Sequence, residues 1–141
     1  MKHEIPFRVI VTNPLKDVLM KVQRGRGEFL DPGRVSSESM TFEFDITVDV
    51  SGVGLNFLGK YAQGPKDGRF VYVNSGKQAG QQNTIWDRRA KLSLMSITKE
   101  QIEAALSKPN SIIETTIDGV GRDGGPVCAS VKGLVWKVLN K

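Results

Sequence analysis

The fold is decided by one stretch of sequence, Met40-Thr41-Phe42-Glu43-Phe44-Asp45-Ile46-Thr47-Val48-Asp49-Val50. Apolar and polar residues alternate over its whole length, which is the two-residue period of a β-strand. This alternation gives one buried and one solvated face, an arrangement that antiparallel sheets allow and buried parallel sheets do not. A register slip of one residue would expose its six apolar side chains, so we expect this strand to fix the register of the sheet.

Shorter segments on both sides of this stretch carry the same pattern and are separated by turn signals such as Asn13-Pro14 and Asp31-Pro32-Gly33. The strand that begins at Val18 is expected to form a hairpin with the strand that begins at Ile5. The predicted strands cover residues 5–12, 18–23, 40–50, 69–74, 84–94, 113–118, 127–131 and 134–138.

One helix is predicted at about residues 98–107. Thr98 and Gln101 have the spacing of a capping box, and Ile97 and Ile102 have that of a hydrophobic staple. Because its apolar stripe is narrow, we expect the helix to lie on a sheet rather than in a bundle. The stripe consists of Ile102, Ala105 and Leu106.

Many short strands and a single helix predict a mainly β fold, that is, a β-rich α+β domain. The two architectures that fit are an antiparallel β-sandwich and a partly closed barrel, each with the helix packed against it. No internal repeat or low-complexity linker interrupts the chain, so residues 1–141 are predicted to form a single domain.

The composition is that of a globular protein, with 141 residues of which 39% are hydrophobic and 25% charged. The net charge of +5 favours anionic partners such as nucleic acid, phosphate-bearing metabolites or acidic surfaces. The cations are scattered rather than clustered, which is also typical of a solvated basic surface.

Several classes of site are disfavoured by what the chain lacks. Cys128 is the single cysteine and His3 the single histidine, which leaves no intrachain disulfide, zinc cluster or histidine-based triad. No run approaches the roughly 18 apolar residues of a membrane span, and the N-terminal residues alternate as a strand does. We therefore expect a cytoplasmic protein with no metal, no cofactor and no contact with a membrane.

Aromatic, amide and cationic residues crowd around glycines between residues 56 and 91, where a ligand can approach the backbone closely. Such a mixture supplies apolar walls with a few polar anchors. The simpler interpretation is that the aromatic residues belong to the core. The candidate ligand-binding residues are Asn56, Tyr61, Gln63, Tyr72, Asn74, Trp86, Arg88 and Arg89.

Three hypotheses for the function follow. The leading one is a non-enzymatic domain that binds a small anionic or polar ligand or an acidic protein surface. The second is a single-stranded nucleic-acid-binding domain, in which basic residues contact phosphates and aromatic residues stack on bases. The third is an enzyme that uses a carboxylate and an arginine, although the sequence assigns no residue a catalytic role. The basic residues of the second hypothesis are Arg24, Arg26, Arg88, Arg89 and Lys91.

A set of short motifs runs through most of the chain: Glu4-Ile5-Pro6-Phe7-Arg8-Val9, Phe57-Leu58-Gly59, Ala62-Gln63-Gly64-Pro65, Arg69-Phe70-Val71-Tyr72-Val73-Asn74-Ser75-Gly76, Arg88-Arg89-Ala90-Lys91, Ile102-Glu103-Ala104-Ala105-Leu106 and Gly121-Arg122-Asp123-Gly124-Gly125-Pro126. Together they resemble a family of small bacterial proteins that is a domain of unknown function. The resemblance implies a bacterial source and a single domain. It implies no activity, cofactor or catalytic residue.

Overall fold

A computed structural model of the 141-residue chain gives the fold. The structure describes residues 2–13, 19–24, 28–51, 54–57, 68–74, 87–93, 97–120 and 134–141. Among these, side chains are described for residues 2–13, 30–50, 97–120 and 134–141.

The described residues form ten strands and one helix. In chain order these are β1 (Lys2–Thr12), β2 (Leu19–Arg24), β3 (Glu28–Leu30), β4 (Arg34–Val35), β5 (Ser39–Ser51), β6 (Gly54–Phe57), β7 (Gly68–Asn74), β8 (Asp87–Ser93), α1 (Lys99–Ser107), β9 (Ser111–Asp118) and β10 (Lys137–Asn140). The short strands β3, β4 and β6 have no counterpart in the sequence prediction, and the predicted strand at 127–131 lies outside the described residues.

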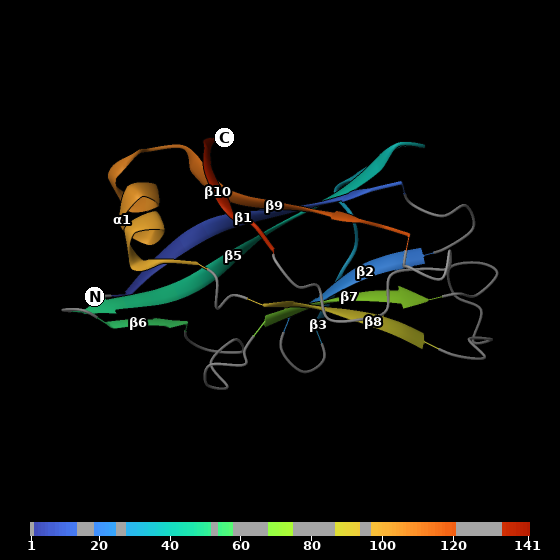
Figure 1. The fold of residues 1–141 in the computed structure, drawn as a ribbon, viewed down its shortest axis with the longest axis horizontal. Coiled ribbons are helices and arrows are strands. Elements are labelled where there is room, and N and C mark those ends of the chain that lie inside the picture. Colours follow the sequence, from blue (N-terminus) through green and yellow to red (C-terminus); the bar gives the residue numbers. More distant parts are fainter. Residues whose placement is uncertain are drawn as a thin grey trace.

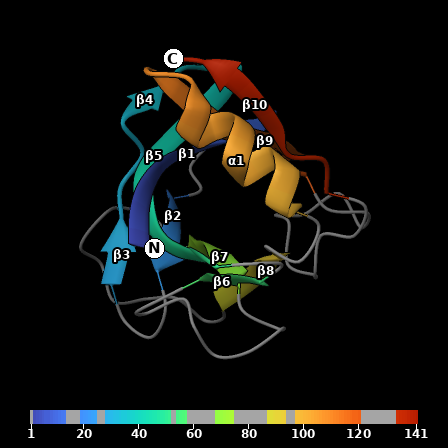
Figure 2. The same ribbon diagram turned by 90° about the vertical axis from the view of Figure 1, so that its left-hand side faces the viewer.

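The strands form two sheets. Sheet A has the order β10-β9-β1-β5-β4, and β6 also pairs with β5. Sheet B has the order β3-β2-β7-β8 and is antiparallel throughout. Figure 1 shows sheet A above sheet B with α1 at one end, and Figure 2 shows the strands curving into a half-barrel. The prediction of a mainly β fold with one helix is confirmed.

The chain departs from the prediction in its connections. The expected hairpin between the first two strands is wrong, because β1 pairs with β5 on one side and β9 on the other. No edge of β1 is left for β2, which pairs with β3 and β7 in sheet B. The β1–β9 pair is parallel, and such a pair requires a long crossover; here the crossover contains all the elements from β2 to α1.

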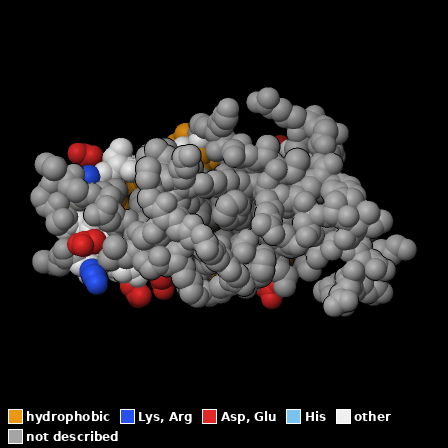
Figure 3. Space-filling model, turned by 90° about the horizontal axis from the view of Figure 1, so that it is seen from below, with side chains coloured by type: hydrophobic (Ala, Val, Ile, Leu, Met, Phe, Trp, Pro, Cys, Tyr) orange, Lys and Arg blue, Asp and Glu red, His pale blue; other side chains and the backbone are white. Residues whose placement is uncertain are grey.

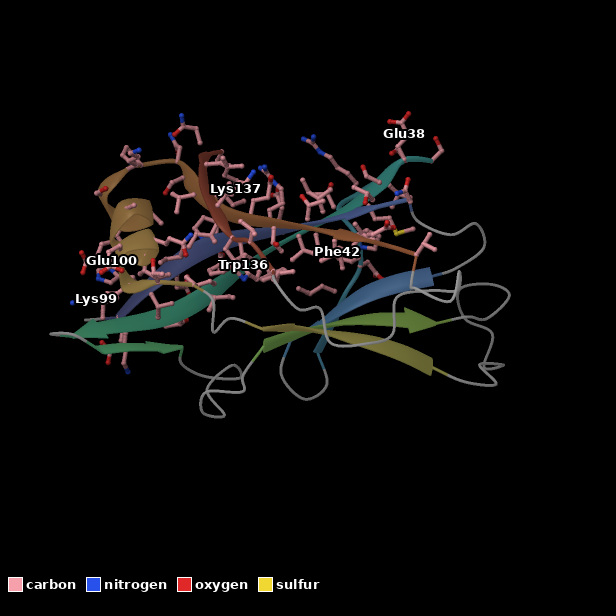
Figure 4. The ribbon with its side chains drawn as sticks, in the orientation of Figure 1. Glu38, Phe42, Lys99, Glu100, Trp136 and Lys137 are labelled. Atoms are coloured by element: carbon pink, nitrogen blue, oxygen red, sulfur yellow. The ribbon has the colours of Figure 1, made fainter. Side chains whose placement is uncertain are left out.

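The core lies on the face of sheet A that is turned toward sheet B. Phe7 and Phe44 are opposed in the β1–β5 register and stack with ring centroids 6.3 Å apart. Trp136 meets Phe7 edge-on at 5.4 Å, and Figure 4 shows its side chain on the same side of sheet A as that of Phe42. The predicted inward face of residues 40–50 is confirmed. Its central members Phe42, Phe44, Ile46 and Val48 are buried, and Met40 and Val50 pack against them.

Helix α1 has the predicted capping box. The Thr98 hydroxyl accepts a hydrogen bond from the Gln101 N–H at 3.1 Å, and the Gln101 side-chain oxygen accepts one from the Thr98 N–H at 3.0 Å. The Gln101 amide also donates to the Trp136 carbonyl at 2.7 Å, which joins the helix start to the segment before β10. Ile102 and Ala105 are buried in the core, whereas the expectation for Leu106 is wrong, since it is 38% exposed.

Gly119 closes the end of sheet A, directly after β9. Its N–H donates to the Thr12 carbonyl at 2.6 Å, which ties the end of β9 to the end of β1. A Cβ at this position would lie 2.9 Å from the Thr12 carbonyl oxygen and 3.0 Å from that of Asn13. Both contacts are with backbone atoms, which cannot rotate away, so the parallel β1–β9 pair requires glycine here.

Gly119→Ala is therefore expected to lower the free energy of unfolding by about 1–3 kcal/mol, as added atoms do in a site without space. Gly33→Ala is the matched control, because its Cβ would meet only the Thr41 carbonyl oxygen, at an ordinary 3.8 Å. Urea denaturation of both variants measures the difference. Equal losses in the two variants would contradict the close approach at Gly119.

Candidate functional site

The structure divides the candidate residues by position. Tyr61, Gln63 and Trp86 lie outside the described residues. Asn56 lies in β6 of sheet A, opposite Asp49 of β5. The remaining four lie in sheet B: Tyr72 and Asn74 in β7, and Arg88 and Arg89 in β8.

The register of sheet B brings together part of this set. Tyr72 is directly opposite Arg89 of β8 on one side and Lys21 of β2 on the other. Opposed residues of an antiparallel pair occupy the same face of the sheet, about 4.5–5.5 Å apart at Cβ. Tyr72 therefore stands in a three-residue row between two cationic positions. Asn74 follows two residues later on the same face, opposite Asp87.

The side chain of Leu30 identifies which face of sheet B is turned to the core. Leu30 packs against the buried cluster of sheet A, and it is opposite Val22 in the β2–β3 register. Val22 in turn is opposite Val71 of β7, which is opposite Ala90 of β8. These positions form the inner face. Tyr72 and Arg89 are each one residue further along, so they occupy the outer face.

This assignment separates Arg88 from Arg89. Arg88 is opposite Val73, an inner-face position, so the two arginines that are neighbours in sequence occupy opposite faces. Tyr72, Asn74 and Arg89 share one face of sheet B, and Asn56 belongs to the other sheet. Tyr72 follows the inner-face position Val71 by one residue, and its interpretation as a core aromatic stays a prediction.

Sequence reasoning did not select several residues that the register places beside Tyr72. The sequence does contain a signal that could have selected Lys21: apolar and polar residues alternate over 18–22, and this pattern puts Lys21 on the polar side of a strand. What the sequence lacked was the pairing of β2 with β7, which sets Lys21 against Tyr72. The other outer-face positions are Leu19, Gln23, Phe29, Gly68, Phe70, Asp87, Lys91 and Ser93, of which Lys91 already belongs to the nucleic-acid hypothesis. We call this set, with Lys21, Tyr72, Asn74 and Arg89, the outer face of sheet B.

A second polar group lies on the outer face of sheet A. Arg8 donates to Glu114 of β9 at 2.8 Å and to Glu43 of β5 at 3.1 Å. The hydrogen bond to Glu114 raises the pKa of Arg8 most, against the opposing effect of burial, and Glu43 raises it further. Lys137 of β10 stands next to Glu114 in the register, so the row alternates in sign.

This row of alternating charge is a structural ladder across four strands rather than a binding site. Glu43 and Glu114 share the single Arg8 guanidinium, and Lys137 stands opposite Glu114 in the register, so the four charges of the row sum to zero. Figure 3 shows that the described charged side chains at the end near the N-terminus and α1 are likewise of both signs. Neither region has the single-sign charge that would select an anionic partner.

Two findings bear on other classes of site. In the ranges whose structure is described, no group of three or more His, Cys, Asp or Glu residues is placed to hold a metal ion. The described helix α1 has nine residues and is not long enough to cross a membrane.

The fold is that of a β-rich half-barrel domain. The chain belongs to the Family of unknown function (DUF5990), whose sequence profile matches residues 5–139. The resemblance seen in the motifs is thereby confirmed as membership of a family of unknown function. No curated protein and no solved structure shows a significant match to the chain. The bacterial source, the single-domain organisation and the cytoplasmic location stay predictions.

The charge ladder gives a stability prediction. Glu114→Gln is expected to lower the free energy of unfolding by about 1–2 kcal/mol, because it weakens a charge-assisted hydrogen bond to a carboxylate only 16% exposed. Glu103→Gln is the control: Glu103 is 56% exposed and pairs with Lys99 at 3.5 Å, and such surface pairs contribute about 0.3–0.5 kcal/mol. Chemical denaturation compares the two, and a loss for Glu103→Gln as large as that for Glu114→Gln would show that the ladder adds nothing.

Proposed function

We propose that this protein is a non-enzymatic domain that binds an anionic partner on the outer face of sheet B. The observation that carries the proposal is the row Lys21–Tyr72–Arg89, in which the register sets an aromatic position between two cationic ones. An aromatic ring offers apolar contact area, and the cations beside it attract and orient negative charge.

Composition and register both support an anionic partner. The net charge is +5, and Lys21, Arg89 and Lys91 occupy outer-face positions on the two strands that flank β7. An arginine supplies a fork of donors that matches carboxylate and phosphate groups, and a lysine adds a point charge. Asn74 adds an amide two residues from Tyr72. The partners anticipated from the sequence are a small anionic or polar ligand, an acidic protein surface and a single-stranded nucleic acid.

We favour binding over catalysis because cationic positions outnumber acidic ones on this face. Asp87 is the one acidic residue among the outer-face positions of the four described strands of sheet B. Asp87 and Arg89 occupy this same face, so an enzyme that uses a carboxylate and an arginine is the alternative hypothesis.

The proposal is tested by removing one cation from the row. Arg89→Ala is expected to weaken binding of an anionic probe by about ten-fold or more, as the loss of a charged hydrogen-bonding partner costs about 1.5–3 kcal/mol. The matched control is Arg34→Ala, which removes the same charge from an exposed position in β4 of sheet A.

Thermal shift and fluorescence titration with three probes provide the measurement: inorganic pyrophosphate, a polyglutamate peptide and heparin. The proposal holds if at least one probe binds and Arg89→Ala, but not Arg34→Ala, weakens it. It fails if no probe binds at low salt, or if both variants lose the same affinity, since the protein would then respond only to net charge.

A further inference from the structure

The outer face of sheet B holds more aromatic positions than an anion alone requires. Phe70 precedes Tyr72 by two residues on the central strand β7, so the two occupy the same face about 7 Å apart. Phe70 is opposite Gln23 of β2, and Gln23 is opposite Phe29 of β3. Lys91 of β8 completes this second row on the other side of Phe70.

We infer that the partner of this face is a single-stranded nucleic acid, with Phe70 and Tyr72 as stacking platforms for bases. The inference rests on the proposed function, because it uses the same face of sheet B. Each of the two aromatic positions on β7 has a cationic position on β8 directly opposite it, Lys91 for Phe70 and Arg89 for Tyr72. This pairing places one positive charge beside each platform, as a chain with one phosphate for each base requires.

The other two classes of partner, a small anionic ligand and an acidic protein surface, would use only some of the residues on this face. A small phosphate or carboxylate ligand uses the cations but has no need of aromatic positions in two successive rows. An acidic protein surface also uses the cations, yet its carboxylates carry no flat ring to stack on Phe70 or Tyr72. A nucleic acid uses both, and aromatic residues on a sheet face that stack on two or three bases are a common way to bind single strands.

The inference also specifies a single strand rather than a duplex. In a duplex the faces of the bases are already stacked on each other, so an aromatic residue on a sheet cannot reach them without disrupting the helix. In a single strand the bases are free to turn outward, and stacking on an aromatic side chain contributes about 1–3 kcal/mol per base. Gln23 and Asn74 supply amides on the same face, which are suited to hydrogen bonds with exposed base edges.

The test is fluorescence anisotropy with end-labelled oligothymidine and oligouridine of about 12 nucleotides, a length within the range of one such binding surface. The wild-type protein is expected to bind, with an affinity that falls steeply as salt is added. Phe70→Leu and Tyr72→Leu keep an apolar side chain but remove the ring, and each is expected to raise Kd by about five- to one-hundred-fold. Arg34→Ala is expected to leave Kd within about two-fold, as a solvent-exposed control.

Heparin, a polyanion without bases, separates this inference from the proposed function. If heparin and the oligonucleotides both depend on Arg89 but the leucine variants bind oligonucleotides as well as the wild type, the stacking inference is overturned while anion binding stands. If neither heparin nor an oligonucleotide binds at low salt, both fail. Equal affinity for a duplex of the same length also overturns the inference. Melting curves of each variant establish that a lost affinity does not come from unfolding.

Discussion

The pairing of β1 with β5 is the interaction on which the rest of the structure depends. The two strands are in register over eleven residue pairs, from Lys2↔Asp49 to Thr12↔Ser39. Their inward residues, among them Phe7 and Phe44, form the core against which Trp136 and helix α1 pack. Because side chains alternate between faces, this same register also places Arg8 and Glu43 together on the outer side, where Glu114 joins them. The β1–β5 register thus determines both this part of the core and the first pair of the charge ladder, Arg8 and Glu43.

The sequence correctly predicts two local features of the structure, because each of them depends only on residues that are close together in the chain. The alternation in 40–50 and the capping box of Thr98 and Gln101 are both confirmed for this reason. The pairing of strands depends on contacts between distant segments, and the pairing predicted from the sequence is wrong. Residues 19–24 pair with 69–74 rather than with the first strand, because both edges of β1 are occupied. A single sequence contains no local signal for such a choice.

The candidate site shows the same limit. The chemistry of Tyr72, Asn74 and Arg89 is visible in the sequence, but their association with Lys21 and their separation from Arg88 follow only from the register of sheet B. Two adjacent arginines form one basic cluster in a sequence. In a β-strand, however, successive residues belong to opposite faces of the sheet. The register also places Tyr72 opposite Arg89 and Lys21, which the sequence alone does not show. The proposed function therefore depends on a property of the sheet that composition and motifs do not contain.

The central claim is that the outer face of sheet B, and Tyr72 in particular, is accessible and covered by the anionic partner. Hydroxyl-radical footprinting followed by mass spectrometry measures this directly, with the fully buried Phe42 as internal reference. We predict that Tyr72 and Phe70 are oxidised much faster than Phe42 in the free protein, and that an oligonucleotide or heparin protects them. If Tyr72 reacts as slowly as Phe42, it is a buried aromatic and the account of this face is contradicted.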